Sequence, residues 1–228
     1  MKIRLKTKKQ LLGNVKAYDF EFEEEFIWRA GQYMIAKIDH EPKDLRGKMR
    51  FITISSAPHE KVIRITTRFF GKKASSFKKA LDSLKIGKHI EIKGPDGDIF
   101  IGDFKKNYVF IAGGIGITPF YSILKQLEFE DKMPRIKLLY ANKDKKFLFD
   151  AFLNDISEKF ENFKMFKFIS PKKIKPSDIK RLDLNLKKTI FFISGPENMI
   201  YKIKLLLNKL GVKDENMKED YFTGYRKI

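Results

Sequence analysis

The chain has 228 residues, of which 43% are hydrophobic, and it contains no cysteine and three histidines. The missing thiols exclude disulfides, thiolate catalysis and cysteine-bound zinc or iron–sulfur clusters within this chain, and the scattered histidines form no metal-ligand spacing. The 48 Lys and Arg residues outnumber the 29 Asp and Glu residues, and the resulting formal net charge of +19 makes nucleic acid one partner class to weigh.

The first hundred residues predict short strands separated by glycine and proline. The strand segments alternate polar with apolar residues or are rich in β-branched and aromatic residues. We expect strands over residues 2–12, 15–23, 32–39, 50–56 and 62–70, a helix over 75–85 and a further strand over 89–94. Ser75 or Ser76 would cap the helix. Short strands with regular turn signals are typical of a β-barrel or sandwich.

The pattern changes after Gly102. Residues 107–114 form a continuous apolar run that ends in glycines, which is typical of a buried parallel strand. We expect further strands over 135–142, 163–170 and 186–195, and helices over 119–129, 149–160 and 197–211. Strands that alternate with helices predict a doubly wound parallel sheet. The chain is therefore expected to have two domains, residues 1–103 and residues 104–228.

A glycine-rich turn, "AGGIGITPF" over residues 112–120, joins an apolar strand to a helix. Gly114 and Gly116 would let the backbone approach a ligand closely, and the helix start would offer free N–H groups to a phosphate. Thr118 adds a hydroxyl, and Pro119 suits the first helical turn. The spacing differs from the usual dinucleotide fingerprint. A tight turn that needs glycine only for space is the alternative interpretation.

A second turn, Ser194-Gly195-Pro196, lies at the carboxyl end of the strand expected over residues 186–195. Ligands of doubly wound sheets collect at the carboxyl ends of the strands. Two such turns could line one crevice, although many α/β proteins have a turn of this composition for structural reasons alone.

The stretch "RFITISSAP", Arg50–Pro58, begins with a charge and continues with hydroxyl residues. An arginine that opens a strand is often solvated. The nearby segment "GKKASSFKKAL", over residues 71–81, places hydroxyls and free N–H groups at a helix start, which is a second seat for an anion. Arg50 and this helix start could clamp a diphosphate from two sides.

Together these motifs resemble the ferredoxin–NADP⁺ reductase superfamily over nearly the whole chain. The flavin motif of that family, Arg, any residue, an aromatic and then Ser or Thr, matches "RFIT" at residues 50–53. The resemblance extends to "SSFKKALDSLKIGKHIEIKGPDGD", "GGIGITPF", "SGPENM" and the carboxyl-terminal "YFTGY". It implies an antiparallel β-barrel that binds FAD, followed by an α/β domain that binds NADPH or NADH.

The resemblance also implies roles for individual residues. Arg50, Ser75 and Ser76 would hold the FAD diphosphate, and Thr53 and Ser194 would orient the flavin and nicotinamide rings. The implied catalytic residues are Thr53, Ser194 and Phe222. The implied cofactor-binding residues are Arg50, Phe51, Ile52, Thr53, Ile54, Ser55, Ile65, Thr66, Thr67, Ser75, Ser76, Gly114, Gly116, Thr118, Pro119, Asn142, Lys143, Gly195, Pro196, Met199 and Tyr225.

Two positions depart from the family pattern. Ile52 stands where the family has a flavin-stacking aromatic, so Phe51, Tyr33 or a carboxyl-terminal aromatic would have to substitute. Ser194 stands where many members have cysteine. Lys143 and its neighbouring lysines could meet the 2′-phosphate of NADPH or could belong to a solvated loop.

The implied activity is electron transfer from a reduced nicotinamide through FAD to a separate acceptor, such as ferredoxin, flavodoxin or a small molecule. A reductase subunit of a multicomponent oxygenase or hydrogenase would have the same sequence features. Alternatives of another class are a basic nucleic-acid-binding module and a nucleotide sensor. The Lys and Arg residues are spread evenly along the chain, so we expect no nucleic-acid partner. We expect an acidic electron carrier or an acidic partner subunit instead. With no apolar run of about 18 residues and no secretory signal, we expect no membrane span and a cytoplasmic protein.

Overall fold

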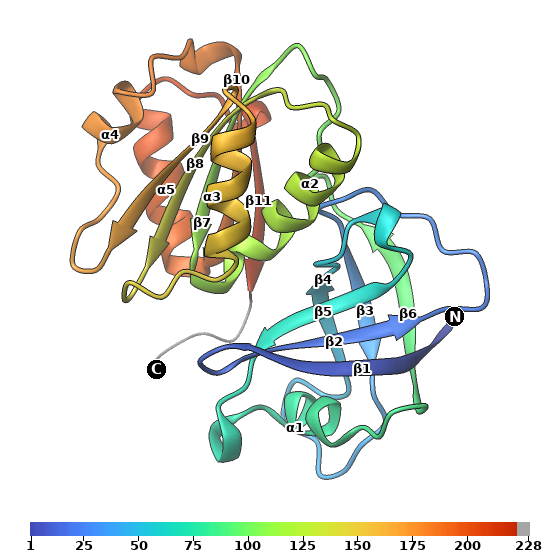
Figure 1. Cartoon of the computed structure of the whole chain (residues 1–228). Helices are drawn as coiled ribbons and strands as arrows, with labels where there is room; N and C mark the ends of the chain where they lie inside the picture. The colour runs from blue at the N-terminus through green and yellow to red at the C-terminus, as the bar shows by residue number, and fades with distance from the viewer. Residues whose placement is uncertain (223–228) are drawn as a thin grey trace. The chain divides into compact units, whose positions relative to one another are not determined.

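The computed structural model describes residues 1–222 and divides the chain into two compact units, Met1–Phe100 and a second that begins at Ile101. Figure 1 shows both units with their helices and strands labelled. The first is built mainly from strands and the second alternates strands with helices, as the sequence predicts.

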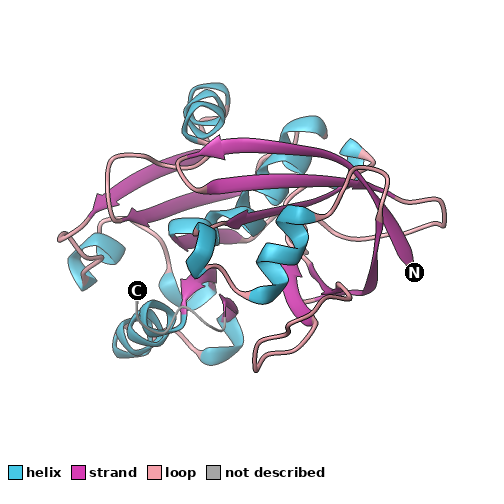
Figure 2. Ribbon diagram, turned by 90° about the horizontal axis from the view of Figure 1, so that it is seen from below, coloured by secondary structure: helices cyan, strands magenta, loops and turns pink. Residues whose placement is uncertain are grey.

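The first unit is a curled antiparallel sheet of six strands. Their order is β4-β3-β6-β1-β2-β5. The strands are β1 (Lys2–Leu12), β2 (Val15–Glu21), β3 (Tyr33–Lys37), β4 (Met49–Thr53), β5 (Ile63–Arg68) and β6 (His89–Asp96). The helix α1 (Ser76–Ser83) lies between β5 and β6 in the chain. Figure 2 shows the helices of the chain in cyan and its strands in magenta. The predicted antiparallel β-barrel is therefore confirmed as a half-barrel sheet.

The core of this unit follows from the two-residue period of its strands. On β3, Met34 and Ala36 are buried while Ile35 lies on the other face and is only partly covered. Helix α1 adds Phe77 and Leu81 to the same core, both 1% exposed. Each such side chain contributes about 1.5–3 kcal/mol of hydrophobic stabilisation. Ser75 caps α1, since its side chain accepts a hydrogen bond from the N–H of Lys78.

The second unit is a parallel sheet of five strands with helices on both faces, which confirms the predicted α/β domain. The strand order is β11-β10-β7-β8-β9. The strands are β7 (Asn107–Gly113), β8 (Arg135–Asn142), β9 (Phe163–Ile169), β10 (Thr189–Pro196) and β11 (Met217–Phe222). The helices are α2 (Thr118–Phe129), α3 (Asp150–Lys159), α4 (Pro176–Lys180) and α5 (Glu197–Lys209).

Alternate residues of the central strand β7 face different helices. Val109 and Ile111 pack with buried residues of α4 and α5, among them Ile179 and Ile203. Phe110 points the other way and stacks on Phe120 of α2, with a ring-centroid distance of 4.6 Å. Both faces of β7 are therefore buried, which explains its continuous apolar sequence.

Two elements of the second unit were not expected from the sequence. Strand β11 pairs in parallel with β10 and forms one edge of the sheet. Its sequence, MKEDYF, is mostly polar because an edge strand buries little of its surface. Helix α4 has five residues, too few to produce a recognisable apolar period. Over residues 1–222, the structure contains no helix whose length and apolar character would suffice to cross a bilayer.

Candidate functional site

An anion seat lies in the first unit, between Arg50 of β4 and the start of α1. It holds a carboxylate of the same chain. Nη2 of Arg50 donates to the two carboxylate oxygens of Asp44 at 2.9 and 3.2 Å. The backbone N–H of Ser76 donates to Oδ2 of Asp44 at 3.2 Å. The two elements predicted to clamp an anion thus converge on one carboxylate.

The electrostatics of this seat favour a negative charge. Burial alone would raise the pKa of the Asp44 carboxyl. Backbone N–H groups of Arg46 and Ser76 and the charges of Arg50 and Arg46 oppose that effect and lower the pKa to about 2. Burial lowers the pKa of the Arg50 guanidinium, and the Asp44 charge opposes that change. A guanidinium stays protonated at physiological pH, so the seat combines a fixed positive charge with a helix N-terminus.

The Arg50 side chain is held in place from several directions. Its Nη1 donates to the carbonyl oxygens of Arg46, Gly47 and Met49 at 2.9, 2.9 and 2.6 Å. The guanidinium also lies over the Phe77 ring, 5.3 Å from its centroid. These contacts fix the direction in which the guanidinium presents its charge. Asp44 and Phe77 were not among the predicted site residues, because neither belongs to a motif and both reach Arg50 only through the fold.

The two hydroxyl residues at the start of α1 have different partners. Ser75 is the cap described above. The Ser76 hydroxyl accepts the backbone N–H of Asp44 at 3.0 Å and lies 2.9 Å from Nε2 of His40. Ser76 is therefore bound to the β3–β4 connection by both its backbone and its side chain. The structure thus brings Arg50 and Ser76 onto one carboxylate, while the Ser75 side chain caps the helix.

The residues next to Arg50 on β4 face in alternating directions. Ile52 is half-buried and packs against the core of the first unit. Phe51 is 67% exposed and lies edge-on to Tyr33, 5.7 Å away between ring centroids. Strand periodicity places Phe51 on the face opposite Arg50 and Ile52. The structure therefore does not bring Phe51 or Tyr33 to the face where the family aromatic would stand. Thr53, at the end of β4, is buried.

Several residues predicted to contact the flavin have side chains that bond to, or pack against, other residues of the first unit. The hydroxyls of Ser55 and Thr66 are 2.7 Å apart, and Ser55 also donates to the carbonyl of Arg64 at 3.0 Å. Ile54 and Ile65 are fully buried in the core. Among these predicted contacts, Thr67 is the one that is only partly buried.

The glycine-rich turn of the second unit is packed tightly. Residues Gly114–Ile117 form a 3₁₀ turn that leads into α2, and Gly114 has a φ of +56°. A Cβ on Gly116 would lie 2.3 Å from the carbonyl oxygen of Ser194, so only glycine fits there. The Thr118 hydroxyl donates to the carbonyl of Ile115 at 3.1 Å and closes the turn. Space is therefore one reason for glycine at position 116, whatever ligand the turn binds.

The Ser194 hydroxyl is the most unusual polar group in this unit. Ser194 is fully buried near the carboxyl end of β10, and its Oγ has no hydrogen-bond partner among the described residues. An unpaired buried hydroxyl costs about 1–3 kcal/mol, so its presence calls for an explanation such as a functional role or a bound water or ion. Carboxyl ends of parallel strands are where these sheets bind ligands. The hydroxyl therefore fits a polar group of a bound molecule.

The remaining predicted residues of the second unit surround the same two turns. A Cβ on Gly113 would contact Met199 and Pro196, at 2.6 Å from the methionine sulfur and 2.9 Å from Cδ of the proline. A Cβ on Gly195 would lie 3.0 Å from Cε of Met199. The glycine-rich turn and the Gly195-Pro196 turn are thus packed against each other, as predicted from their places at strand ends. Pro119 is buried in the first turn of α2.

Strand β8 ends beside these turns. The hydroxyl of Tyr140 donates to the carbonyl of Gly114 at 3.1 Å and fixes the glycine-rich turn; no sequence motif points to this contact. The Asn142 side chain donates to the carbonyl of Lys146 at 2.8 Å and orders the loop after β8. Lys143 in that loop is exposed.

Two predicted residues lie at the carboxyl terminus. Phe222 is the last residue of β11, and its backbone pairs with Pro196. Tyr225 lies outside the described residues.

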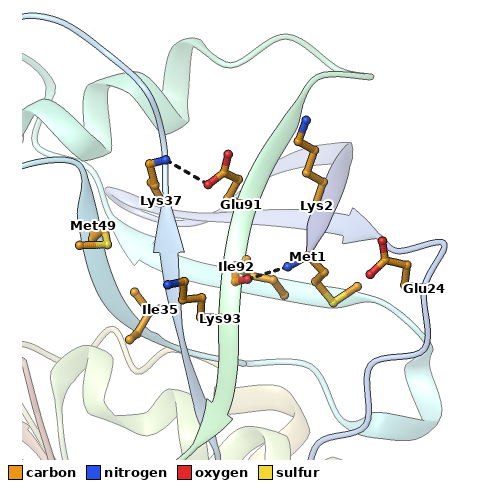
Figure 3. A pocket seen from close by; sticks show the side chains of 9 residues that line it. All are labelled: Met1, Lys2, Glu24, Ile35, Lys37, Met49, Glu91, Ile92 and Lys93. Carbon is orange, nitrogen blue, oxygen red and sulfur yellow. Dashed lines mark hydrogen bonds and ion pairs between the residues drawn. The ribbon is translucent and has the colours of Figure 1, made fainter.

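A separate hollow of about 420 Å³ lies on the outer face of the first unit, over β3, β4 and β6. Figure 3 shows its lining, which includes Ile35, Met49 and an ion pair between Lys37 and Glu91, with an N–O distance of 3.0 Å. None of the predicted site residues lines it.

Comparison with known families matches both units. Residues 2–101 match the model of an oxidoreductase FAD-binding domain, and residues 110–204 match that of an oxidoreductase NAD-binding domain. The anion seat at Arg50 and α1 fits the diphosphate of FAD. The glycine turns and the Ser194 hydroxyl fit a nicotinamide dinucleotide. The chain thus contains a domain for each cofactor, FAD and NAD(P)H.

Individual relatives agree with these domains. The gamma subunit of sulfhydrogenase 2 from Pyrococcus furiosus is 31% identical over 140 residues, covering 60% of this chain and 45% of the relative. A component of the Na⁺-translocating NADH-quinone reductase from Idiomarina loihiensis is 29% identical, covering 92% of this chain and 57% of the relative. The chain spans about half the length of these curated relatives.

Solved structures show the same fold. Ferredoxin-NADP⁺ reductase from Plasmodium falciparum superposes with a TM-score of 0.80 at 18% identity, covering 97% of this chain and 95% of the other.

Proposed function

Since the chain belongs to the ferredoxin–NADP⁺ reductase superfamily of FAD- and NAD-binding oxidoreductases, we propose that it is an NAD(P)H-dependent reductase that passes electrons through FAD to a separate acceptor. The observation that carries the proposal is the order of the matched domains, FAD-binding over residues 2–101 and NAD-binding over residues 110–204. The acceptor is ferredoxin, flavodoxin or a small molecule. With 48 basic against 29 acidic residues, an acidic carrier protein would be attracted electrostatically.

The first unit would hold FAD mainly through its diphosphate. Arg50 offers a fixed guanidinium and α1 offers the N–H of Ser76, so two directed donors and a helix dipole meet the anion. Thr53 ends the strand that carries Arg50, where its hydroxyl and the following backbone would face the flavin ring. When bound, FAD accepts a hydride from the nicotinamide and releases electrons to the next carrier.

The second unit would hold the nicotinamide dinucleotide at its two glycine turns. Gly114 and the start of α2 would approach the diphosphate, and Gly116, whose Cβ position is filled by the Ser194 carbonyl, would hold the two turns together beside it. Ser194 would donate to or accept from the polar group of the nicotinamide, which satisfies its unpaired hydroxyl. Asn142 and Lys143 would lie near the adenosine ribose. The exposed Lys143 ammonium favours NADPH, whose 2′-phosphate it could meet, over NADH.

A second candidate is a reductase subunit of a larger oxidoreductase. The match to a sulfhydrogenase gamma subunit, together with the coverage of about half of that relative, favours it. In that case the acceptor is a cofactor in another subunit. Affinity purification of the tagged chain from its own cells distinguishes the two, since a stoichiometric oxidoreductase partner is expected only for a subunit.

The test of the proposed reaction uses the purified chain with FAD. Binding of one FAD per chain and its reduction by NADPH or NADH under anaerobic conditions would support the proposal. A salt-dependent affinity for RNA without flavin binding would instead support the nucleic-acid alternative.

A further inference from the structure

Asp44 stands between the two groups that are expected to bind the FAD diphosphate. Its carboxylate receives Nη2 of Arg50 and the N–H of Ser76, so it uses the donors that a phosphate oxygen would need. The residue comes from the connection between β3 and β4, six positions before Arg50 in the chain. A carboxylate and a phosphate carry the same sign of charge and the same acceptor chemistry.

We propose that Asp44 is an internal competitor of FAD: its carboxylate holds the diphosphate seat, and the cofactor binds by displacing it. This inference rests on the proposed function, because it concerns the occupancy of the flavin site.

The competition follows from the donors available. Nη1 of Arg50 is already directed at three backbone carbonyls, so Nη2 is the part of the guanidinium that points into the seat. The single backbone N–H of Ser76 cannot form a strong hydrogen bond to the Asp44 carboxylate and to the diphosphate at the same time. A diphosphate placed beside an undisplaced Asp44 would also be repelled by it. FAD binding and the Asp44 contacts therefore exclude each other.

The Asp44 side chain can leave the seat without exposing an unpaired charge. Arg46 donates its backbone N–H to Oδ1 of Asp44 at 3.0 Å and its Nη2 to Oδ2 at 3.3 Å. Because these two donors of Arg46 lie beside the carboxylate, they can keep it paired when the Asp44 side chain turns out of the seat, while the Arg46 carbonyl stays bonded to Nη1 of Arg50. Leu45, between them, is fully exposed, so no burial of its side chain resists the movement.

The alternative role of Asp44 would be to support the structure of the FAD site. In that case Asp44 would orient Arg50 for the cofactor, and its removal would weaken FAD binding. The two roles predict opposite changes in affinity, so one substitution separates them.

The experiment compares FAD affinity in wild type, Asp44→Asn and Asp39→Asn, each freed of flavin and titrated with FAD by fluorescence. Asp39 is a matched control, since it lies in the same connection and pairs with Lys48 at 3.4 Å rather than with Arg50. We expect Asp44→Asn to lower the Kd by about tenfold, the change expected when one charge-assisted hydrogen bond no longer has to be broken. Asp39→Asn should stay within about twofold, as exposed ion pairs contribute little.

The melting temperature without FAD provides an independent readout. Asp44→Asn should lower it, because Arg50 loses its partner, while the same variant binds FAD more tightly. An unchanged or weakened FAD affinity in Asp44→Asn overturns the inference alone. Failure of all three proteins to bind FAD overturns the proposed function, and this inference with it.

Binding kinetics of the wild type test the inference even if Asp44→Asn does not fold. Displacement predicts that the observed rate of FAD association rises and then levels off with FAD concentration, at the rate at which Asp44 leaves the seat. A rate that stays linear in FAD concentration up to saturation would contradict it.

Discussion

Gly116 lies so close to Ser194 that a Cβ on the glycine would be 2.3 Å from the serine carbonyl oxygen. This contact joins the glycine-rich turn after β7 to the carboxyl end of β10. It fixes the position of both turns beside the buried hydroxyl of Ser194. The structure of the nucleotide site and the stability of the second unit therefore depend on the same close approach.

Replacing Gly116 with alanine should destabilise the second unit. The new methyl group meets backbone rather than a flexible side chain, so one of the two turns has to shift, at a cost of about 2–4 kcal/mol. For a chain of this size we expect a fall in melting temperature of about 5–15 °C. Calorimetry of the purified variant measures it. An unchanged melting temperature would show that the turns are not packed as described.

Ser194→Ala, in contrast to Gly116→Ala, should reduce activity while changing stability little. Removing a buried hydroxyl that has no partner among the described residues costs little stability and can add up to about 1 kcal/mol. If the hydroxyl serves the nicotinamide, kcat/KM for NAD(P)H should fall by about tenfold. The matched control is Thr189→Val on the same strand, whose hydroxyl donates to the carbonyl of Asn185 at 2.8 Å. The control should lose about 1 kcal/mol of stability and keep its kinetics. Equal kinetics in Ser194→Ala and wild type would remove Ser194 from the site.

Arg50→Ala should weaken FAD binding strongly. The guanidinium is a charged donor fixed beside the start of α1, and loss of a charge-assisted contact to a phosphate costs about 2–3 kcal/mol, or roughly a hundredfold in Kd. Arg4→Ala is the control, because Arg4 pairs with Glu21 at the surface of the β1–β2 hairpin. Flavin content after purification gives a first answer and titration the Kd. Full flavin retention by Arg50→Ala would place the diphosphate elsewhere.

Asp44 should make the free energy of unfolding depend on pH in acid. Its pKa is about 2 in the folded chain and about 3.9 when unfolded. A lowered folded pKa stabilises the protein above pH 4, and this stabilisation disappears as the pH falls from about 4 to 2. We expect a contribution of about 1–2 kcal/mol, reduced by partial exposure of the carboxylate. Denaturant titrations of flavin-free wild type and Asp44→Asn should differ above pH 4 and converge near pH 2. A constant difference across that range would refute the assignment.

Much of the fold could be predicted because its core strands have clear periods. The apolar run of β7 is buried on both faces, and β3 alternates as a strand with one buried face should. Strand β11 could not be predicted, since Met217 is the one buried residue among positions 217–220 and the strand is held at the sheet edge by pairing with β10. Elements with many buried positions could thus be predicted from their sequence, whereas an element with few buried positions could not.

For the site, residue types could be predicted but their partners could not. Arg50 and Ser76 were expected to face an anion, yet nothing in the sequence places Asp44 between them, because that contact is formed by the fold. Gly116 was expected to make room for a ligand, whereas the structure shows that it makes room for Ser194. Contacts between segments far apart in the chain cannot be read from local motifs.

The proposed reaction, transfer of electrons from a reduced nicotinamide to FAD, can be observed in a single experiment. The FAD-loaded protein is titrated anaerobically with NADPH and, separately, with NADH, and the visible absorption of the flavin is followed. We expect at least one of the two coenzymes to bleach the flavin band with one equivalent per chain. Stoichiometrically bound FAD that neither coenzyme can reduce would show that the chain does not catalyse this reaction.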